Sequence, residues 1–253
     1  MTAKSGLIVA LALGALIVAL VAPPIAQDPA YHEFVDRQEI LGVANFWNVV
    51  SNIPFAFVGI AGLFVVGRKL PPGAIPALRP AYVMFFIGVA LVSLGSGYYH
   101  LGPANASLVW DRLPMTFAFM AFFAAIVGEN ISVDIGARLL WPLVAVGVFS
   151  VGYWHFTELG GRGDLRPYAL VQFLPMLLIP VILLLYRSPF TGNLWIWLAL
   201  LAYAASKIAE LADAPVFAAV GIGGHAFKHL LAALGALFVL LALVLRRPIE
   251  RSD

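Results

Sequence analysis

The chain has 253 residues, of which 62% are hydrophobic and only 11% are charged. Soluble domains carry about 25% charged residues, so this composition predicts a polytopic membrane protein and excludes a soluble globular one. The net charge is only +2 and the basic residues are scattered, so nothing indicates a nucleic-acid partner. Cysteine is absent, which excludes disulfides, thiolate zinc sites and thiol nucleophiles.

The first apolar run covers residues 6–26 and follows a single cation, Lys4. A cleaved signal peptide and a retained membrane helix both fit such a run. Small residues near its end would allow cleavage, but Pro23 and Pro24 make a poor cleavage site, so the sequence favours a retained helix. We expect residues 1–27 to form this N-terminal transmembrane helix or signal segment, followed by a short polar lead-in.

Seven further apolar segments follow, and each has about the 20 residues that a bilayer crossing requires. They cover approximately residues 46–66, 80–101, 111–128, 138–156, 167–186, 193–212 and 225–245. The linkers between them are too short to hold a soluble domain. The sequence therefore predicts an all-α polytopic membrane protein, with a seven-helix bundle over residues 28–245, one additional N-terminal helix and a basic tail over residues 246–253.

Loop charges predict the orientation, because cytoplasmic loops are enriched in Lys and Arg. With a cytoplasmic N-terminus, the basic residues that fall inside are Lys4, Arg68, Lys69, Arg79, Arg138, Arg187, Arg246, Arg247 and Arg251. Those that fall outside are Arg37, Arg112, Arg162 and Arg166. This imbalance predicts a cytoplasmic C-terminus, with Glu129 as an ordinary residue of a cytoplasmic loop.

Five residues with metal-binding or catalytic potential lie at the predicted outer ends of these segments. Ser96 and His100 are four residues apart and share one helical face, and Asp111 follows eleven residues later. His225 and His229 form a second pair with helical spacing. The orientation places all five at one depth, which favours a single site. Taken singly, each has a simpler alternative: interhelical hydrogen bonds for the histidines, a helix N-cap for the aspartate and a helix contact for the serine.

Three histidines would leave a fourth coordination position for water, which is typical of a catalytic zinc rather than a structural one. Bound zinc lowers the pKa of such a water to about 7. In this interpretation, His100, His225 and His229 are the zinc ligands. Asp111 is the general base that later passes the proton to the leaving group, and Ser96 bonds the developing oxyanion or the water.

Other polar residues near the outer ends are candidates for substrate contact. Lys207 and Glu210 are three residues apart, so a salt bridge between them is the simpler hypothesis and contact with a lipid headgroup the alternative. Lys228 is predicted to point away from the histidines and to extend towards the interface. His155 could contact the substrate or complete the metal site, although an interfacial position explains it as well. The charged loop at 160–167 is predicted to form a lid.

The chain resembles the alkaline ceramidases, within the wider group of seven-helix membrane hydrolases that includes the adiponectin-type receptors. The matching blocks, in the order of the family, are Phe46-Trp47-Asn48-x-x-Ser51-Asn52, Gly95-Ser96-x-x-x-His100, Asp111-x-Leu113-Pro114-Met115 and His225-x-x-x-His229. The resemblance implies that the three histidines bind zinc and that Ser96 and Asp111 complete the site. It also implies hydrolysis of the amide bond of ceramide, which releases a fatty acid and a sphingoid base.

Two departures from the family bear on cofactor and substrate. Eukaryotic ceramidases carry an acidic residue directly before the Phe-Trp-Asn block, where this chain has Asn45, and the acids at Glu33, Asp36 and Glu39 are spaced differently. This argues against bound Ca²⁺. The additional N-terminal segment and compact loops indicate a bacterial member in the inner membrane, with its site on the extracytoplasmic side. Because most bacteria lack ceramide, the natural substrate could be another N-acyl lipid.

Two alternative functions are also open. One is hydrolysis of an ester lipid by the same chemistry. The other is a receptor-like or transport protein whose zinc is structural. The sequence leaves the oligomeric state open.

Overall fold

Eight apolar helices are the main elements of the protein. The computed structural model describes residues 2–249, and within that range eight helices are long and apolar enough to cross a bilayer. This confirms the predicted fold class of seven core helices and one N-terminal helix. The α-helices are α1 (Ala3–Val21), α2 (Phe46–Val50), α3 (Ile53–Arg68), α4 (Arg79–Leu101), α5 (Asn105–Asn130), α6 (Val133–Leu159), α7 (Arg166–Leu185), α8 (Leu194–Leu211), α9 (Asp213–Val220) and α10 (Gly224–Leu245). Short 3₁₀ helices cover Pro29–His32 and Pro76–Leu78, and residues 2–249 contain no β-strand.

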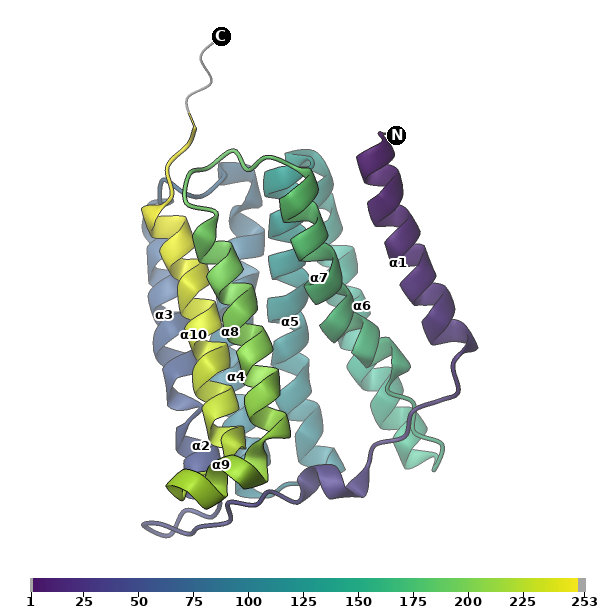
Figure 1. Cartoon of the computed structure of the whole chain (residues 1–253), viewed down its shortest axis with the longest axis vertical. Helices are drawn as coiled ribbons and strands as arrows, with labels where there is room; N and C mark the ends of the chain where they lie inside the picture. The colour runs from purple at the N-terminus through teal and green to yellow at the C-terminus, as the bar shows by residue number, and fades with distance from the viewer. Residues whose placement is uncertain (1, 250–253) are drawn as a thin grey trace.

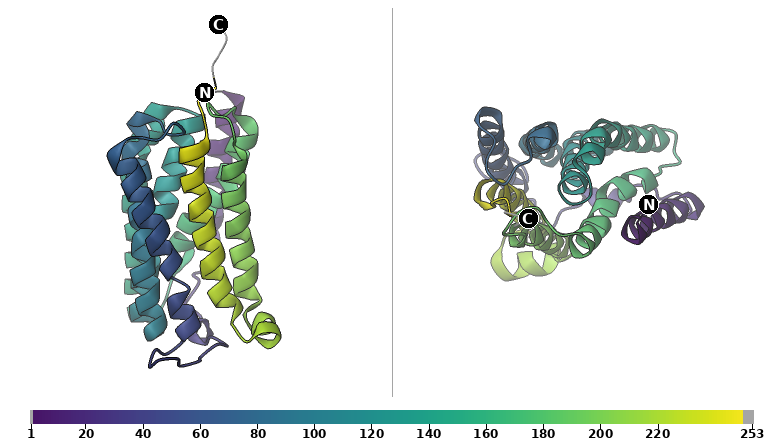
Figure 2. Two further views of the ribbon diagram at one scale, coloured as in Figure 1. Left: turned by 90° about the vertical axis from the view of Figure 1, so that its left-hand side faces the viewer. Right: turned by 90° about the horizontal axis from the view of Figure 1, so that it is seen from above.

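The core helices form a ring, and α1 lies outside it (Figures 1 and 2). α3 packs against α4, α4 against α5, and α5 against α6, so neighbours in sequence are also neighbours in space. α10 packs between α3 and α8, while α1 packs against α7. The start of α1 and the end of α10 lie at one end of the bundle (Figure 1). The end of α4 and the starts of α5 and α10 therefore meet at the opposite end.

A glycine allows α4 and α5 to approach closely where they carry candidate site residues. A Cβ atom at Gly95 would collide with the carbonyl oxygen of Trp110. Small residues permit such backbone contact between membrane helices. Gly95 directly precedes Ser96, and Trp110 directly precedes Asp111. The close approach thus brings these two polar residues to the same cavity.

The start of α5 differs from the prediction. The helix begins at Asn105, with Ala104 as its N-cap and the backbone N–H of Ala104 donating to Ser107 Oγ at 3.1 Å. The predicted start at residue 111 is therefore wrong by six residues. Asp111 lies inside the helix and is buried, so it does not cap the helix.

One predicted segment is interrupted, and one short helix is additional to the prediction. The segment over residues 46–66 consists of α2 and α3, with Ser51 and Asn52 at the break between them. Pro54 is the second residue of α3 and has no backbone N–H, so it suits the start of a helix. The short helix α9 after α8 is not predicted by the sequence, and it ends at Gly221 with a positive φ of 73°.

A buried ion pair joins α5 and α10 at the end of the bundle that holds the termini. The guanidinium of Arg246 donates to both carboxylate oxygens of Glu129, at 3.0 and 3.1 Å, and the hydroxyl of Tyr82 donates to the same carboxylate at 2.9 Å. Glu129 and Arg246 are both buried. Glu129 is thus a helix residue rather than a loop residue, and Arg246 differs from the solvated tail residue expected from the sequence. Residues 250–253 of that tail, including Arg251, lie outside the described residues.

Replacing Glu129 with Gln is expected to lower the free energy of unfolding by about 3 kcal/mol, because the change leaves the buried Arg246 without a counter-charge. Thermal and denaturant unfolding of the purified protein in micelles measures this loss. Asp134→Asn is the matched control, since it breaks the exposed Asp134–Arg138 pair, which is worth less than about 1 kcal/mol. Equal stability of the two variants would contradict a role for the buried pair.

Candidate metal centre

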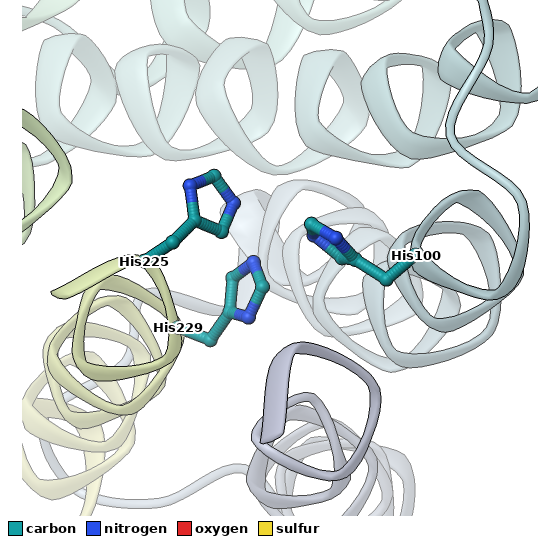
Figure 3. A group of neighbouring side chains, drawn as sticks. All are labelled: His100, His225 and His229. Carbon is teal, nitrogen blue, oxygen red and sulfur yellow. The ribbon is translucent and has the colours of Figure 1, made fainter. Parts of the chain in front are cut away.

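Three buried histidines from two helices face one another at the end of the bundle opposite the termini. His100 lies in the last turn of α4, and His225 and His229 lie in the first turns of α10. Each pair of imidazole rings has a centroid separation of 4.9 Å. Candidate ligand atoms of the three residues lie within 4.8 Å of one another, and the rings surround a common space (Figure 3). The structure thus brings together the three residues that the sequence proposes as ligands.

The hydrogen bonding of these rings fits a metal. Nδ1 of His100 is buried and has no hydrogen-bond partner among the described residues. A buried polar atom without a partner is costly, and a metal ion or a bound water would satisfy it. On His229, Nδ1 lies 2.8 Å from Ser51 Oγ, whose hydroxyl donates to the carbonyl of Asn48. Ser51 Oγ can therefore accept a hydrogen bond from Nδ1–H of His229, which leaves Nε2 of that ring free for a metal.

The break between α2 and α3 positions these supporting groups. Because the helix is interrupted at Ser51, that side chain can reach across to α10. Asn45 adopts a left-handed backbone conformation with φ of 50°, and its side-chain amide donates to the carbonyl of His100 at 2.9 Å. In the sequence, this block is marked only by its resemblance to the ceramidase blocks. That these residues hydrogen-bond to His229 and His100 follows from the packing of α2 and α3 beside α4 and α10.

Replacing Ser51 with Ala is expected to weaken metal-ion affinity, tested with Zn²⁺, about 10–100-fold, because the hydrogen bond that orients His229 is lost. Competition with a chromophoric chelator measures the affinity. Ser150→Ala is a matched control: Ser150 is also buried, but its hydroxyl donates to Gly147 within α6. Equal zinc affinity of the two variants would show that Ser51 does not orient a ligand.

The polar lead-in before α2 covers the histidines. The ring centroid of Phe34 lies 4.7 Å from that of His100 and 4.5 Å from that of His225, and Phe34 is buried. The carboxylate of Asp213 accepts hydrogen bonds from the backbone N–H of Val35 at 3.2 Å and of His225 at 2.9 Å, which fastens the lead-in to the start of α10. The lead-in, predicted only as a connection, therefore closes this end of the site.

The charged loop at 160–167 is not the lid that the sequence predicts. Its backbone N–H at Leu165 donates to the carbonyl of Ile25 at 2.7 Å, so the loop holds the linker that follows α1. Arg166 pairs with Asp164 at 2.7 Å, and this guanidinium holds the pKa of the Asp164 carboxyl below its usual range. Leu165 of the loop lines a cavity that Asp111 also lines, but the ring that packs against His100 and His225 is that of Phe34 in the lead-in.

A long apolar cavity begins at the metal centre and extends into the bundle. Ser96, Asp111 and His229 line one part of it. Phe85, Phe122 and Val239 are among the many apolar residues that line the rest. The cavity encloses roughly 940 Å³, including its open part. Its polar groups converge at one end and its walls are hydrophobic, which is typical of a site for a molecule with one polar and one apolar part.

Charged residues lie beside this polar end. Lys207 Nζ lies 2.6 Å from Glu210 Oε2, which confirms the predicted salt bridge. Lys228 pairs with the other oxygen of Glu210 and lines the same cavity, so it does not extend towards the interface as the sequence predicts. The reason is that the side chains of α8 and α10 meet here, since these helices pack along their length.

His155 is the one candidate residue that the structure does not bring to the site. Its ring packs between Trp154 and Phe156 on α6, with centroid separations of 6.4 and 5.7 Å, and it lines neither cavity that contains Asp111. The nearby Glu158 is also remote, because its carboxylate accepts from the backbone N–H of Gln27 and from the Asn105 amide. The helical phase of α6 directs both side chains elsewhere.

Fold and site together define a polytopic helical membrane protein with a buried candidate metal centre at the end of an apolar cavity. A sequence model of the family described as Ceramidase matches residues 40–186, which is more than half of the chain. The chain belongs to the ceramidase family. The matched range includes Ser96, His100 and Asp111 but ends before α8, so His225 and His229 are joined to the site by the structure. No curated protein matches the chain.

Proposed function

We propose that this protein is a zinc-dependent amidohydrolase that cleaves the amide bond of ceramide or a ceramide-like N-acyl lipid in the membrane. Membership of the ceramidase family supports hydrolysis of this bond. One observation supports zinc dependence above all: His100, His225 and His229 form a buried triad at the polar end of an apolar cavity. The cavity walls suit an acyl chain, and the polar end suits the amide.

The histidines would hold the metal as neutral imidazoles, as His–zinc coordination requires. When bound, zinc would supply a Lewis acid and lower the pKa of a coordinated water. Asp111 would accept the proton of the attacking water and then deliver it to the leaving nitrogen as the C–N bond breaks. Ser96 would donate a hydrogen bond to the carbonyl oxygen as negative charge develops on it. The products are a fatty acid and an amine.

A second cavity supports entry of the substrate from the bilayer. It comprises roughly 720 Å³, including its open part, beside α5, α7 and α8, and it shares Asp111, Lys207 and Lys228 with the first cavity. Phe173, which also lines it, is 51% exposed on the lipid-facing side of α7. Since Phe34 covers the histidines from the other side, we propose that lipid enters laterally beside α7 and α8. Lys207 and Glu210 would contact its headgroup.

The loop charges support an extracytoplasmic site in this proposal, with the C-terminus in the cytoplasm. We place the protein in a bacterial inner membrane, with residues 28–245 as the catalytic unit and α1 as an additional anchor.

Fatty-acid release by the purified protein tests the proposal. The substrates are C16-ceramide and, as the ester alternative, 1-palmitoyl lysophosphatidylcholine, with palmitate measured by mass spectrometry. We expect palmitate from ceramide or a related amide, loss of release with 1,10-phenanthroline and recovery on addition of zinc. Release from the ester alone would favour the ester hydrolase. Bound zinc without release from any lipid would favour a structural metal in a receptor-like protein.

A further inference from the structure

Arg112 is a buried cation without an acidic partner. It is only 5% exposed, and among residues 2–249 no carboxylate forms an ion pair with it. Nη2 donates to Oε1 of Gln27 at 2.7 Å, but Nη1 is buried without any hydrogen-bond partner among the described residues. A buried charge normally requires a counter-charge and full hydrogen bonding. This guanidinium therefore has a donor group free for an anion.

Aromatic rings hold the guanidinium in place. Its Cζ atom lies 4.3 Å from the ring centroid of Trp154, 4.8 Å from that of Tyr168 and 5.6 Å from that of Tyr31. Such cation–π contacts stabilise the cation but satisfy none of its N–H donors. The rings hold the guanidinium in place and leave Nη1 without a hydrogen-bond acceptor.

Arg112 lines the cavity beside α5, α7 and α8 that reaches the metal centre. The charged residues that line this cavity are the cations Arg112, Lys207 and Lys228 and the acids Asp111 and Glu210. Both lysines already pair with Glu210. The three cations outnumber the two acids, so the cavity has an excess of positive charge, in a setting where unpaired charge is expensive.

The position of Arg112 limits where an anion would lie. It directly follows Asp111 in the chain, so their Cα atoms are about 3.8 Å apart. Asp111 is the proposed proton donor to the leaving nitrogen. Both side chains line the cavity beside α5, α7 and α8, so an anion on Arg112 would lie on the side of Asp111, with the amine half of the substrate.

We propose that the preferred substrate is an N-acyl lipid whose amine half carries an anionic group, a carboxylate or a phosphate, bound by Arg112. This inference rests on the proposed amide hydrolysis and specifies its substrate class. Arginine suits planar or tetrahedral oxyanions because its N–H groups form charge-assisted hydrogen bonds with them. Lys207 and Lys228 add positive charge to the lining of the same cavity.

Two matched substrate pairs test the inference and separate the two anions. N-palmitoylserine and N-palmitoylserinol differ by a carboxylate against a hydroxymethyl group, and ceramide 1-phosphate and ceramide differ by the phosphate. We expect kcat/KM to be about 10–100-fold higher for the charged member of at least one pair, as a charge-assisted hydrogen bond provides. In Arg112→Gln, this preference should fall at least tenfold, mainly through a higher KM.

Two further variants are included, one as a second test in case Arg112→Gln misfolds and one as a control for nonspecific charge effects. Lys207→Gln removes a cation whose side chain is 27% exposed, so folding is less at risk, and it should also reduce the preference. Arg138→Gln removes an exposed cation of α6 and should leave the preference unchanged. Binding of N-palmitoylserine and N-palmitoylserinol to the metal-free protein, followed by tryptophan fluorescence, gives a readout independent of turnover.

The outcomes separate this inference from the proposed function. Equal or better hydrolysis of the neutral lipids would overturn the anionic substrate class while amide hydrolysis stands. A preference that survives in Arg112→Gln and Lys207→Gln would overturn the assigned residues. If metal-loaded protein hydrolyses no amide, the proposed function fails. In that case, preferential binding of N-palmitoylserine that is lost in Arg112→Gln supports the anion site, and equal binding of the two lipids overturns it.

Discussion

Replacing His229 with Ala is expected to abolish lipid hydrolysis and stoichiometric zinc binding together. His229 contributes one of three rings that lie 4.9 Å apart, so its loss would leave only two candidate ligands. A catalytic zinc contributes several kcal/mol of transition-state stabilisation, so we expect kcat/KM to fall by more than about 10³-fold. Metal content is measured by mass spectrometry of the purified protein, and turnover by release of palmitate.

His155→Ala is the matched control for this substitution, because His155 also lies on a core helix but packs between Trp154 and Phe156. It should retain zinc and most of the turnover. Stoichiometric zinc in His229→Ala with unchanged hydrolysis would contradict a metal centre at the histidine triad. Zinc lost with hydrolysis retained would show instead that the metal is structural.

Replacing Asp111 with Asn is expected to reduce kcat about 10²–10⁴-fold while zinc stays bound. The amide has nearly the shape of the carboxylate, but it cannot accept a proton from water and return it to the leaving nitrogen. Asp111 is buried and lines both cavities, so the loss should appear in the chemical step rather than in folding. Single-turnover kinetics with metal analysis of the same sample measures both quantities.

Asp134→Asn is the control for this change, since Asp134 is an exposed carboxylate paired with Arg138. Its turnover should match that of the wild type. If Asp111→Asn retains more than a tenth of the wild-type kcat, the proton transfer must use another group. Loss of zinc in Asp111→Asn would instead identify Asp111 as a metal ligand.

Local sequence patterns predict the helices and most of the proposed metal centre. Apolar runs of bilayer length predict all eight long helices, since this signal depends only on the hydropathy of consecutive residues. The spacing of His225 and His229 predicts a shared helical face for the same local reason. The loop charges and the helix order predict that His100 lies at their end of the bundle, and the structure has the three together.

Other parts of the site depend on contacts between distant segments. The burial of Asp111 follows from the early start of α5, where Ala104 carries no side-chain capping signal. Phe34 packs over His100 because the lead-in is hydrogen-bonded to Asp213 near the start of α10. No periodic pattern in the sequence predicts this contact. The direction of Lys228 depends on the rotation of α10 against α8.

The sequence by itself determined an all-helical membrane protein and the residue types of a histidine metal site, because hydropathy and helical spacing act over one segment at a time. The tertiary structure alone decided which polar groups support His229, what covers the histidines and which cations face the cavity. These properties depend on how each helix is rotated and packed, and a buried donor such as Nη1 of Arg112 is recognised only when all of its neighbours are in place.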